Sequence, residues 1–435
     1  MIKDPVGSFL KWTQALHVLP NAPQGSFCCC SNAGVDPMTL GLATCWEPAM
    51  AFRIPWVAAR RWLSRGGIPK QPNVGQDANV SELLQSAMME EEEEDAEGEG
   101  DGTLRKVRRA PEEAAVLLFP GQGSQFVGMG QGLLRYPNVR DLYRVAEDVL
   151  GYDLLSLCVE GPSAQLDRTV HSQPAVFVSS LAAVEKLHHQ QPTVVENCVA
   201  AAGFSIGEYA ALVFAGAMNY PEALYAVKVR AEAMQEASEA VPSGMLSVIG
   251  RRNSNYVTAC MEAREYCKSV GIENPVCEVS NYLFPDGRVI AGHLQALEFL
   301  QQNSKKYSFG RVKMLPVSGA FHTQLMESAV KPLSEALNSI NIQKPLIPVY
   351  SNVESQKYTQ SKQIQRLLVK QLVSPVKWEQ TMHAIYERKK GVGFPYTYEV
   401  GPGKQLGAIL KSCNLKAWNF YKHIAVSEDE AKNET

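Results

Sequence analysis

The serine at position 205 is the residue around which chemistry can be built. It lies in the pattern G-x-S-x-G over residues 203–207, after the apolar run 198–202 and before a helix-forming segment that starts at Glu208. Strand, sharp turn and helix in this order are typical of a nucleophile elbow, in which the glycines relieve crowding and the hydroxyl projects from the turn. The free N–H groups at the start of the helix favour a developing anion. The alternative is a tight turn whose glycines serve packing alone.

A serine hydroxyl needs a general base at neutral pH. His322 is the candidate among the eight histidines, because it follows residues 316–321, where a strand end opens into a loop. Catalytic side chains are often found in such loops. The alternative is a core or capping histidine. No acidic residue stands out between Ser205 and His322 as a third member of a triad. We therefore expect a Ser–His dyad whose imidazole is oriented by a neutral acceptor.

A third candidate is Arg230, on a helix expected over 221–237. It is aligned at helical spacing with small and apolar residues such as Val227. A buried arginine is costly unless it is paired. The partner is either an internal carboxylate, with Glu208 and Glu222 as candidates, or a carboxylate that a substrate supplies. A guanidinium binds a carboxylate through two parallel hydrogen bonds, which lysine cannot copy.

The elements around these residues follow an α/β pattern. The apolar run 116–119 leads into a Gly-rich loop at 121–125, as a strand feeding a turn would, and the run 198–202 is a second buried strand. Beyond residue 318 we expect further alternation: helix 323–339, strand 347–353, helices 364–371 and 378–389, and strand 397–400.

Between these parts the order of elements changes. Strand 245–249, helix 253–269, strands 276–280 and 288–291, helix 293–303 and strand 312–317 follow one another. This β-α-β-β-α-β order is that of a ferredoxin-like unit. We therefore predict a large parallel-sheet α/β catalytic domain over 113–237 and 318–427. It is interrupted by a ferredoxin-like subdomain at 238–317.

Composition bounds the class of protein. The chain has 435 residues, a formal net charge of -3 and 45% hydrophobic residues. These values argue against whole-chain disorder and against a strongly basic nucleic-acid binder. Ten cysteines without a CxxC pair make neither a disulfide scaffold nor a zinc knuckle, so we expect reduced thiols. The apolar window 198–218 resembles a membrane span, but a strand, a turn and a helix explain it better because it contains Ser205 and Glu208.

The first 112 residues form an N-terminal leader of a different kind. Residues 48–76 contain no Asp or Glu, and their arginines alternate with apolar and aromatic residues, which favours a mitochondrial presequence. The alternative is a basic helix that lies on a surface or a membrane. Because Met50 stands directly before this stretch, our hypothesis is that it is the working initiator. Nine acids among the twelve residues 90–101 then predict a disordered linker.

Short motifs over residues 114–425 match those of a known family and follow one another in the same order as in that family. The chain resembles the malonyl-CoA:acyl carrier protein transacylases, and most closely their vertebrate mitochondrial form. The motifs that carry the resemblance are FPGQGSQ at 119–125, SQPA at 172–175, GFSIGE at 203–208, the segment from Arg230 to Met234, GAFH at 319–322, SPVKW at 374–378 and EVGPGK at 399–404. Phe204 departs from the histidine that many relatives have, although the mitochondrial form shares the apolar residue.

The resemblance implies a role for each site residue. Ser205 carries the acyl group, His322 is its general base and acid, and the backbone N–H groups of Gln122 and Ile206 form the oxyanion hole. The main-chain carbonyl of Gln371 holds the His322 ring. Arg230 binds the malonyl carboxylate. The implied fold is an α/β-hydrolase-like core with the ferredoxin-like insert.

The resemblance also implies the reaction. Malonyl would pass from malonyl-CoA to Ser205 and then to the phosphopantetheine thiol of acyl carrier protein. This transfer would supply fatty-acid synthesis in the mitochondrial matrix. The substrates carry the pantetheine, so the implied enzyme needs no metal or bound cofactor, and we expect neither nucleic acid nor a membrane span. The alternatives are a serine (thio)esterase of the α/β-hydrolase type, which sends the acyl group to water, and a non-catalytic carrier-binding protein.

Overall fold

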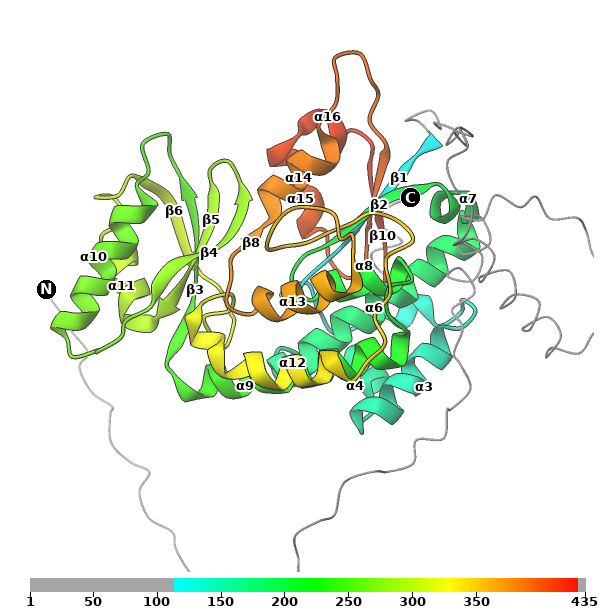
Figure 1. Ribbon diagram of the computed structural model, residues 1–435, viewed down its shortest axis with the longest axis horizontal. Coiled ribbons are helices and arrows are strands. Elements are labelled where there is room, and N and C mark those ends of the chain that lie inside the picture. The colour runs from blue at the N-terminus through cyan, green and yellow to red at the C-terminus, as the bar shows by residue number, and fades with distance from the viewer. Residues whose placement is uncertain (1–112, 429–435) are drawn as a thin grey trace, which may run out of the picture. The chain divides into compact units, whose positions relative to one another are not determined.

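The computed structural model of the protein describes residues 113–428. The predictions for the leader, namely the presequence at 48–76, the initiator Met50 and the acidic linker at 90–101, concern residues outside this range. Within it, strands and helices alternate as an α/β fold (Figure 1).

The first sheet has five parallel strands in the order β10-β9-β1-β2-β7. The strands are β1 (Ala115–Phe119), β2 (Cys198–Gly203), β7 (Val349–Tyr350), β9 (Tyr396–Val400) and β10 (Tyr421–Ile424). Because β1 and β2 are parallel neighbours with Phe119 opposite Gly203, the loops after both strands leave the same edge of the sheet. The expected strand at 347–353 is shorter than predicted, since only two of its residues pair with β2.

Helices cover both faces of this sheet. Leu117 and Phe119 of β1 pack into the larger apolar core, whereas Val116 and Leu118 between them pack into a second core on the other face. Strand residues that alternate between two buried faces produce the continuous apolar run seen in the sequence. The larger core contains side chains of α3 (Val139–Leu150), α4 (Leu154–Glu160), α6 (Thr169–Gln190), α8 (Gly207–Phe214), α9 (Tyr220–Ala240), α12 (Val330–Asn338) and α13 (Ser361–Gln371). The second core contains those of α14 (Trp378–Tyr386), α15 (Gln405–Cys413) and α16 (Leu415–Trp418).

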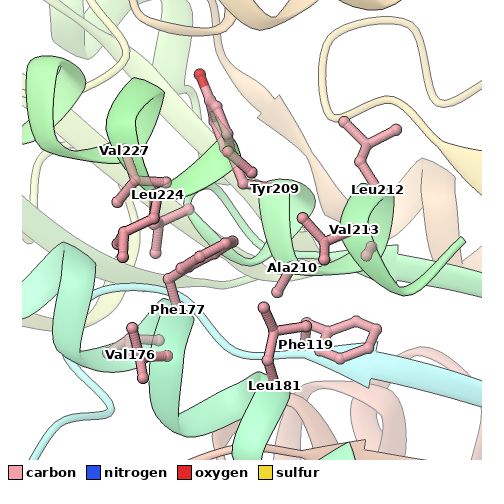
Figure 2. Packing of buried hydrophobic residues seen from close by; sticks show 14 of the residues in the cluster. Phe119, Val176, Phe177, Leu181, Tyr209, Ala210, Leu212, Val213, Leu224 and Val227 are labelled. Carbon is pink, nitrogen blue, oxygen red and sulfur yellow. The ribbon is translucent and has the colours of Figure 1, made fainter. Parts of the chain in front are cut away.

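Helix α8 is buried on all sides, which explains why the sequence around it resembles a membrane span. Each of its eight residues is buried. Figure 2 shows Ala210 and Val213 of α8 close to Phe177 and Leu181 of α6 and to Phe119 of β1. The window 198–218 is thus a strand, a turn and a helix, as predicted. Among residues 113–428, no helix is both long enough and apolar enough to cross a bilayer.

The second sheet has the order β6-β3-β5-β4-β8. Its elements are β3 (Ser243–Gly250), α10 (Tyr256–Ser269), β4 (Cys277–Phe284), β5 (Gly287–His293), α11 (Leu294–Gln302), β6 (Phe309–Met314) and β8 (Val376–Lys377). The first four strands pair antiparallel, and α10 and α11 pack on one face through their own apolar core (Figure 1). The predicted ferredoxin-like order is therefore confirmed.

Three details differ from the predictions. The last strand of this sheet ends at Met314 rather than 317, although the Leu315 N–H still donates to the Met245 carbonyl of β3 at 2.9 Å. A fifth strand, β8, comes from beyond the insert and pairs parallel with β4. The helix expected over 323–339 begins as a 3-10 segment, η3 (Gln324–Ala329), before α12. The remaining short elements are η2 (Gln131–Leu133), α5 (Ser163–Leu166) and α7 (Pro192–Glu196).

The start of α8 lies unusually close to β1 and β2. A Cβ atom added to Gly207 would lie 2.3 Å from the carbonyl oxygen of Phe119, and one added to Gly203 would lie 1.9 Å from the backbone of Gly207. Backbone atoms cannot rotate out of the way as a flexible side chain can. The two glycines of the motif are therefore required by contact between main chains.

We predict that Gly207→Ala destabilises the fold by about 3 kcal/mol, at the upper end of overpacking costs, because the methyl group meets backbone atoms. Gly244→Ala is the matched control, since its nearest neighbours are side-chain ends at 3.3 Å or more. The control should shift stability by less than about 1 kcal/mol. Urea unfolding followed by circular dichroism measures both. Equal midpoints for the two variants would contradict the proposed main-chain contact.

Candidate active site

Ser205 occupies the turn between β2 and α8 with a left-handed backbone, at φ 53°. A non-glycine residue in this region costs roughly 1–3 kcal/mol and persists only where its surroundings hold it. Asn352, in the segment after β7, supplies this support. Its Oδ1 accepts a hydrogen bond from the Ser205 N–H at 2.7 Å, and its Nδ2 donates to the Gly203 carbonyl at 2.7 Å. Asn352 was missed from the sequence, where its only signal was a polar side chain within an expected strand.

The structure brings Ser205 and His322 together. Ser205 Oγ lies 2.9 Å from His322 Nε2, and both residues are buried. His322 Nδ1 lies 2.7 Å from the main-chain oxygen of Gln371, at the end of α13. A carbonyl only accepts, so the proton sits on Nδ1, and Nε2 is left with a lone pair that faces the serine hydroxyl. The imidazole is thus oriented by a neutral acceptor.

Burial sets the protonation state of this histidine. The pKa of His322 is lowered to about 4, first because burial disfavours the imidazolium and then because the Arg230 charge lies nearby. The hydrogen bond to the Gln371 carbonyl raises it only in part. At neutral pH the ring is therefore neutral and able to accept a proton from Ser205.

Arg230 lies fully buried in the middle of α9 and reaches the same hydroxyl. Its Nη2 donates to Ser205 Oγ at 3.1 Å and to Gln371 Oε1 at 2.8 Å, and its Nη1 donates to Gln173 Oε1 at 2.6 Å. No carboxylate of residues 113–428 forms an ion pair with it, and in that range its Nε has no acceptor. Burial lowers the pKa of the guanidinium. Of the two partners considered from the sequence, an internal salt bridge with Glu208 or Glu222 is therefore not formed.

The backbone N–H groups of Gln122 and Ile206 lie on neighbouring segments. Gln122 is in the loop after β1, and Ile206 directly follows Ser205. Neither N–H has an acceptor among the residues that the structure describes, so both remain available to a substrate oxygen. The Gln122 side chain is held by Thr169 at 3.2 Å and by Gln173 at 3.3 Å, which places α6 behind this loop.

Two buried residues beyond those predicted complete the polar cluster. The Glu208 carboxylate accepts from Gln371 Nε2 at 2.6 Å, from the Asn352 N–H at 3.3 Å and from the Tyr358 hydroxyl. Burial raises its pKa to about 7, although these hydrogen bonds act in the opposite direction. Glu208 was considered from the sequence only as a partner of Arg230, and nothing marked Tyr358. Phe204, the apolar residue beside the nucleophile, packs edge-on against Trp378.

Comparison with known proteins identifies the family. The family model described as the acyl transferase domain matches residues 116–402. The mouse protein named malonyl-CoA-acyl carrier protein transacylase, mitochondrial, is 63% identical over 381 residues, which are 88% of this chain and 98% of that protein. The human protein of the same name is 64% identical, over 86% of this chain and 94% of its own.

Solved structures agree with these relatives. An acyl carrier protein S-malonyltransferase from Vibrio cholerae is 32% identical, with a TM-score of 0.65, over 74% of this chain and 99% of its own. A malonyl-transacylase solved with its type II PKS acyl-carrier protein is 33% identical, with a TM-score of 0.63, over 72% of this chain and 96% of that one. The chain therefore belongs to the acyl transferase domain family and, within it, to the malonyl-CoA-acyl carrier protein transacylases.

The two buried titrating groups predict the pH dependence of acylation. The pH dependence of kcat/KM reports the pKa values of the ionisable groups of the free enzyme. Because the pKa of His322 is lowered to about 4, its base form persists until the pH falls close to that value. The pKa of Glu208 is about 7, so a loss of rate near neutrality comes from that carboxylate.

We therefore expect that kcat/KM of the Glu208→Gln variant no longer falls as the pH drops through neutrality. It should fall only as the pH approaches 4. Rapid-quench mass spectrometry of Ser205 acylation by malonyl-CoA, across the pH range, measures this dependence. If the variant still loses activity with a midpoint near about 6.5, His322 titrates as an ordinary histidine.

Proposed function

We propose that this protein transfers malonyl from malonyl-CoA to the phosphopantetheine thiol of acyl carrier protein through a malonyl-Ser205 intermediate. The observation that carries the proposal is the environment of one atom. Ser205 Oγ lies 2.9 Å from a neutral imidazole and 3.1 Å from a guanidinium that has no carboxylate partner among residues 113–428. A nucleophile, its base and a receptor for an acyl carboxylate thus meet at one hydroxyl.

In the first half-reaction His322 Nε2 takes the hydroxyl proton while Ser205 Oγ attacks the thioester carbonyl. The new C–O bond places negative charge on the carbonyl oxygen, and the N–H groups of Gln122 and Ile206 are the donors that we assign to it. Collapse of this intermediate breaks the C–S bond, and the His322 imidazolium returns its proton to the departing CoA sulfur. Malonyl-Ser205 and free CoA are the products.

The second half-reaction uses the same groups in reverse. The carrier thiol replaces CoA, gives its proton to His322 Nε2 and attacks the ester carbonyl of malonyl-Ser205. The C–O bond breaks, and the proton returns to Ser205 Oγ. The proposal assigns no step to a metal or a bound cofactor, because the substrates carry the pantetheine and the dyad supplies the proton transfers.

Arg230 supplies selection by charge. One methylene separates the malonyl carboxylate from the carbonyl carbon, so a guanidinium 3.1 Å from Ser205 Oγ lies within reach of that carboxylate in the acyl-enzyme. Acetyl lacks the carboxylate and leaves the buried charge without an anionic partner. Selection therefore comes both from binding malonyl and from the cost of an unpaired charge.

The partners and the compartment follow from the same family. The chain is a mitochondrial member, as its mouse and human relatives are. We place its reaction in the matrix, where it would supply malonyl groups for fatty-acid synthesis. The carrier is the mitochondrial acyl carrier protein, in line with a similar transacylase that was solved with its own carrier. The alternative activity, a serine (thio)esterase, differs only in the acceptor, which is water.

The covalent route predicts a malonyl adduct on Ser205. Incubation with malonyl-CoA alone should add one malonyl mass to the wild-type protein and none to Ser205→Ala. His322→Ala should slow both half-reactions by ~10²–10⁴-fold, the usual contribution of general acid–base catalysis. Intact mass spectrometry and double-reciprocal plots with a carrier thiol are the measurements, and the plots should be parallel. Intersecting lines would contradict the covalent route, and equal turnover without a thiol would indicate the esterase.

The role of Arg230 predicts a change in substrate preference. Arg230→Ala should lower kcat/KM for malonyl-CoA by about 100-fold, because it removes two charge-assisted hydrogen bonds that contribute about 1.5 kcal/mol each. Acetyl-CoA should be transferred as well as before or better. Arg230→Lys should lie between the two, because an ammonium group cannot bind both carboxylate oxygens in a planar fork. If both substrates fall by the same factor in these variants, Arg230 is structural.

A further inference from the structure

Glu208 is a buried acid close to Arg230, and a neutral residue is hydrogen-bonded to both of them. Glu208 is buried and accepts three hydrogen bonds, from Gln371 Nε2, the Asn352 N–H and the Tyr358 hydroxyl. The amide and the backbone N–H can only donate, so the Glu208 oxygens act as acceptors toward Gln371 and Asn352. No cation among residues 113–428 forms an ion pair with Glu208. A buried carboxylate beside a buried guanidinium would ordinarily be expected to pair with it.

Gln371 occupies the position between the two charges. Its Nε2 donates to Glu208 Oε2 at 2.6 Å and to the Ser205 carbonyl at 3.1 Å. Its Oε1 accepts from Arg230 Nη2 at 2.8 Å. Rotating the amide by half a turn would place an NH₂ group against the guanidinium and an oxygen against the carboxylate. The donor on Arg230 and the acceptor on Glu208 therefore determine the direction of the amide.

Within the part of the chain that the structure describes, the hydrogen bonds of the Arg230 guanidinium therefore all go to neutral acceptors. Gln173, Gln371 and Ser205 contact Arg230 through amide and hydroxyl oxygens. These contacts fix the position of the side chain and leave its positive charge without a contacting anion. A carboxylate at position 371 would hold the side chain equally well but would neutralise it, so a substrate carboxylate would gain little by binding there.

We propose that the Glu208–Gln371 pair is a specificity determinant, in which Glu208 orients the Gln371 amide so that a neutral oxygen holds Arg230 and its charge stays available to a substrate carboxylate. The inference rests on the proposed function, because it takes malonyl as the group that Arg230 selects. Gln371 then has two separate tasks. Its main-chain oxygen orients His322, and its side chain sets the electrostatics of acyl selection.

The decisive experiment exchanges the two side chains. The double variant Glu208→Gln/Gln371→Glu retains one carboxylate and one amide in the buried cluster but places the carboxylate on Arg230. The ratio of kcat/KM for malonyl-CoA to that for acetyl-CoA should fall by at least about tenfold, the contribution of one charge-assisted hydrogen bond. Labelling of Ser205 by a fluorophosphonate, which carries no carboxylate, should fall less than malonyl transfer does.

Glu208→Gln alone is the matched control. It keeps an oxygen that can accept from Gln371, and Arg230 stays on a neutral amide. Its malonyl-to-acetyl ratio should therefore remain within about threefold of wild type, less than one charge-assisted hydrogen bond. If the exchange variant keeps the wild-type ratio, or the control loses as much as the exchange variant, the inference is wrong. Equal losses of malonyl transfer, acetyl transfer and labelling also overturn it, because the pair then only supports the fold around His322.

Thermal unfolding shows whether the exchange variant folds. If it does not fold, a second variant tests the inference. Gln371→Met removes the amide and keeps the main-chain oxygen for His322. The malonyl-to-acetyl ratio should again fall, and an unchanged ratio would overturn the inference. The malonyl adduct on wild-type Ser205 distinguishes a failure of the proposed function from a failure of the specificity determinant. Its absence would refute the proposed function, whereas an adduct with ratios that none of these variants alters refutes the specificity determinant alone.

Discussion

The active site depends on close main-chain contact between the start of α8 and the carboxyl ends of β1 and β2. A Cβ atom at Gly207 would lie 2.3 Å from the Phe119 carbonyl oxygen, so only glycine allows this approach. The contact turns the chain sharply at Ser205, which Asn352 holds in a left-handed conformation, and it brings the turn against the loop after β1 that carries Gln122. Every other group of the site is arranged around a hydroxyl that this turn has already placed.

Around that hydroxyl the protein uses neutral acceptors where charged ones are commoner. A main-chain carbonyl orients His322, and two glutamine side chains hold Arg230. Burial lowers the pKa of the His322 imidazole most, and the nearby Arg230 charge lowers it further, so that His322 stays in its base form. The charge that prepares the site for an acyl carboxylate thus also prepares the base.

The inserted subdomain affects how the two residues of the dyad are positioned. Ser205 precedes the ferredoxin-like unit in the chain and His322 follows it, so four of the five strands of the second sheet lie between the two residues in the sequence. Strand β8, which follows Gln371 by a few residues, pairs with β4 of that sheet. The segments that carry His322 and its acceptor are therefore both anchored close to the second sheet, and the imidazole is held from two sides.

The sequence by itself determined the elements and the reacting residues. These features are local patterns, and each depends on residues near one another in the chain: strands that are apolar on both faces, the glycines on either side of Ser205, and the β-α-β-β-α-β order. The motifs around Ser205, His322 and Arg230 indicated the family. Only the tertiary structure decided how the charges are paired. The partner of Arg230 could not be read from spacing, because Gln173, Ser205 and Gln371 come from three distant segments. The bonding of Asn352 and Glu208 depends in the same way on which loops meet at the sheet edge. Hydrogen bonds in a buried cluster follow from packing in three dimensions, which a pattern along one element does not contain.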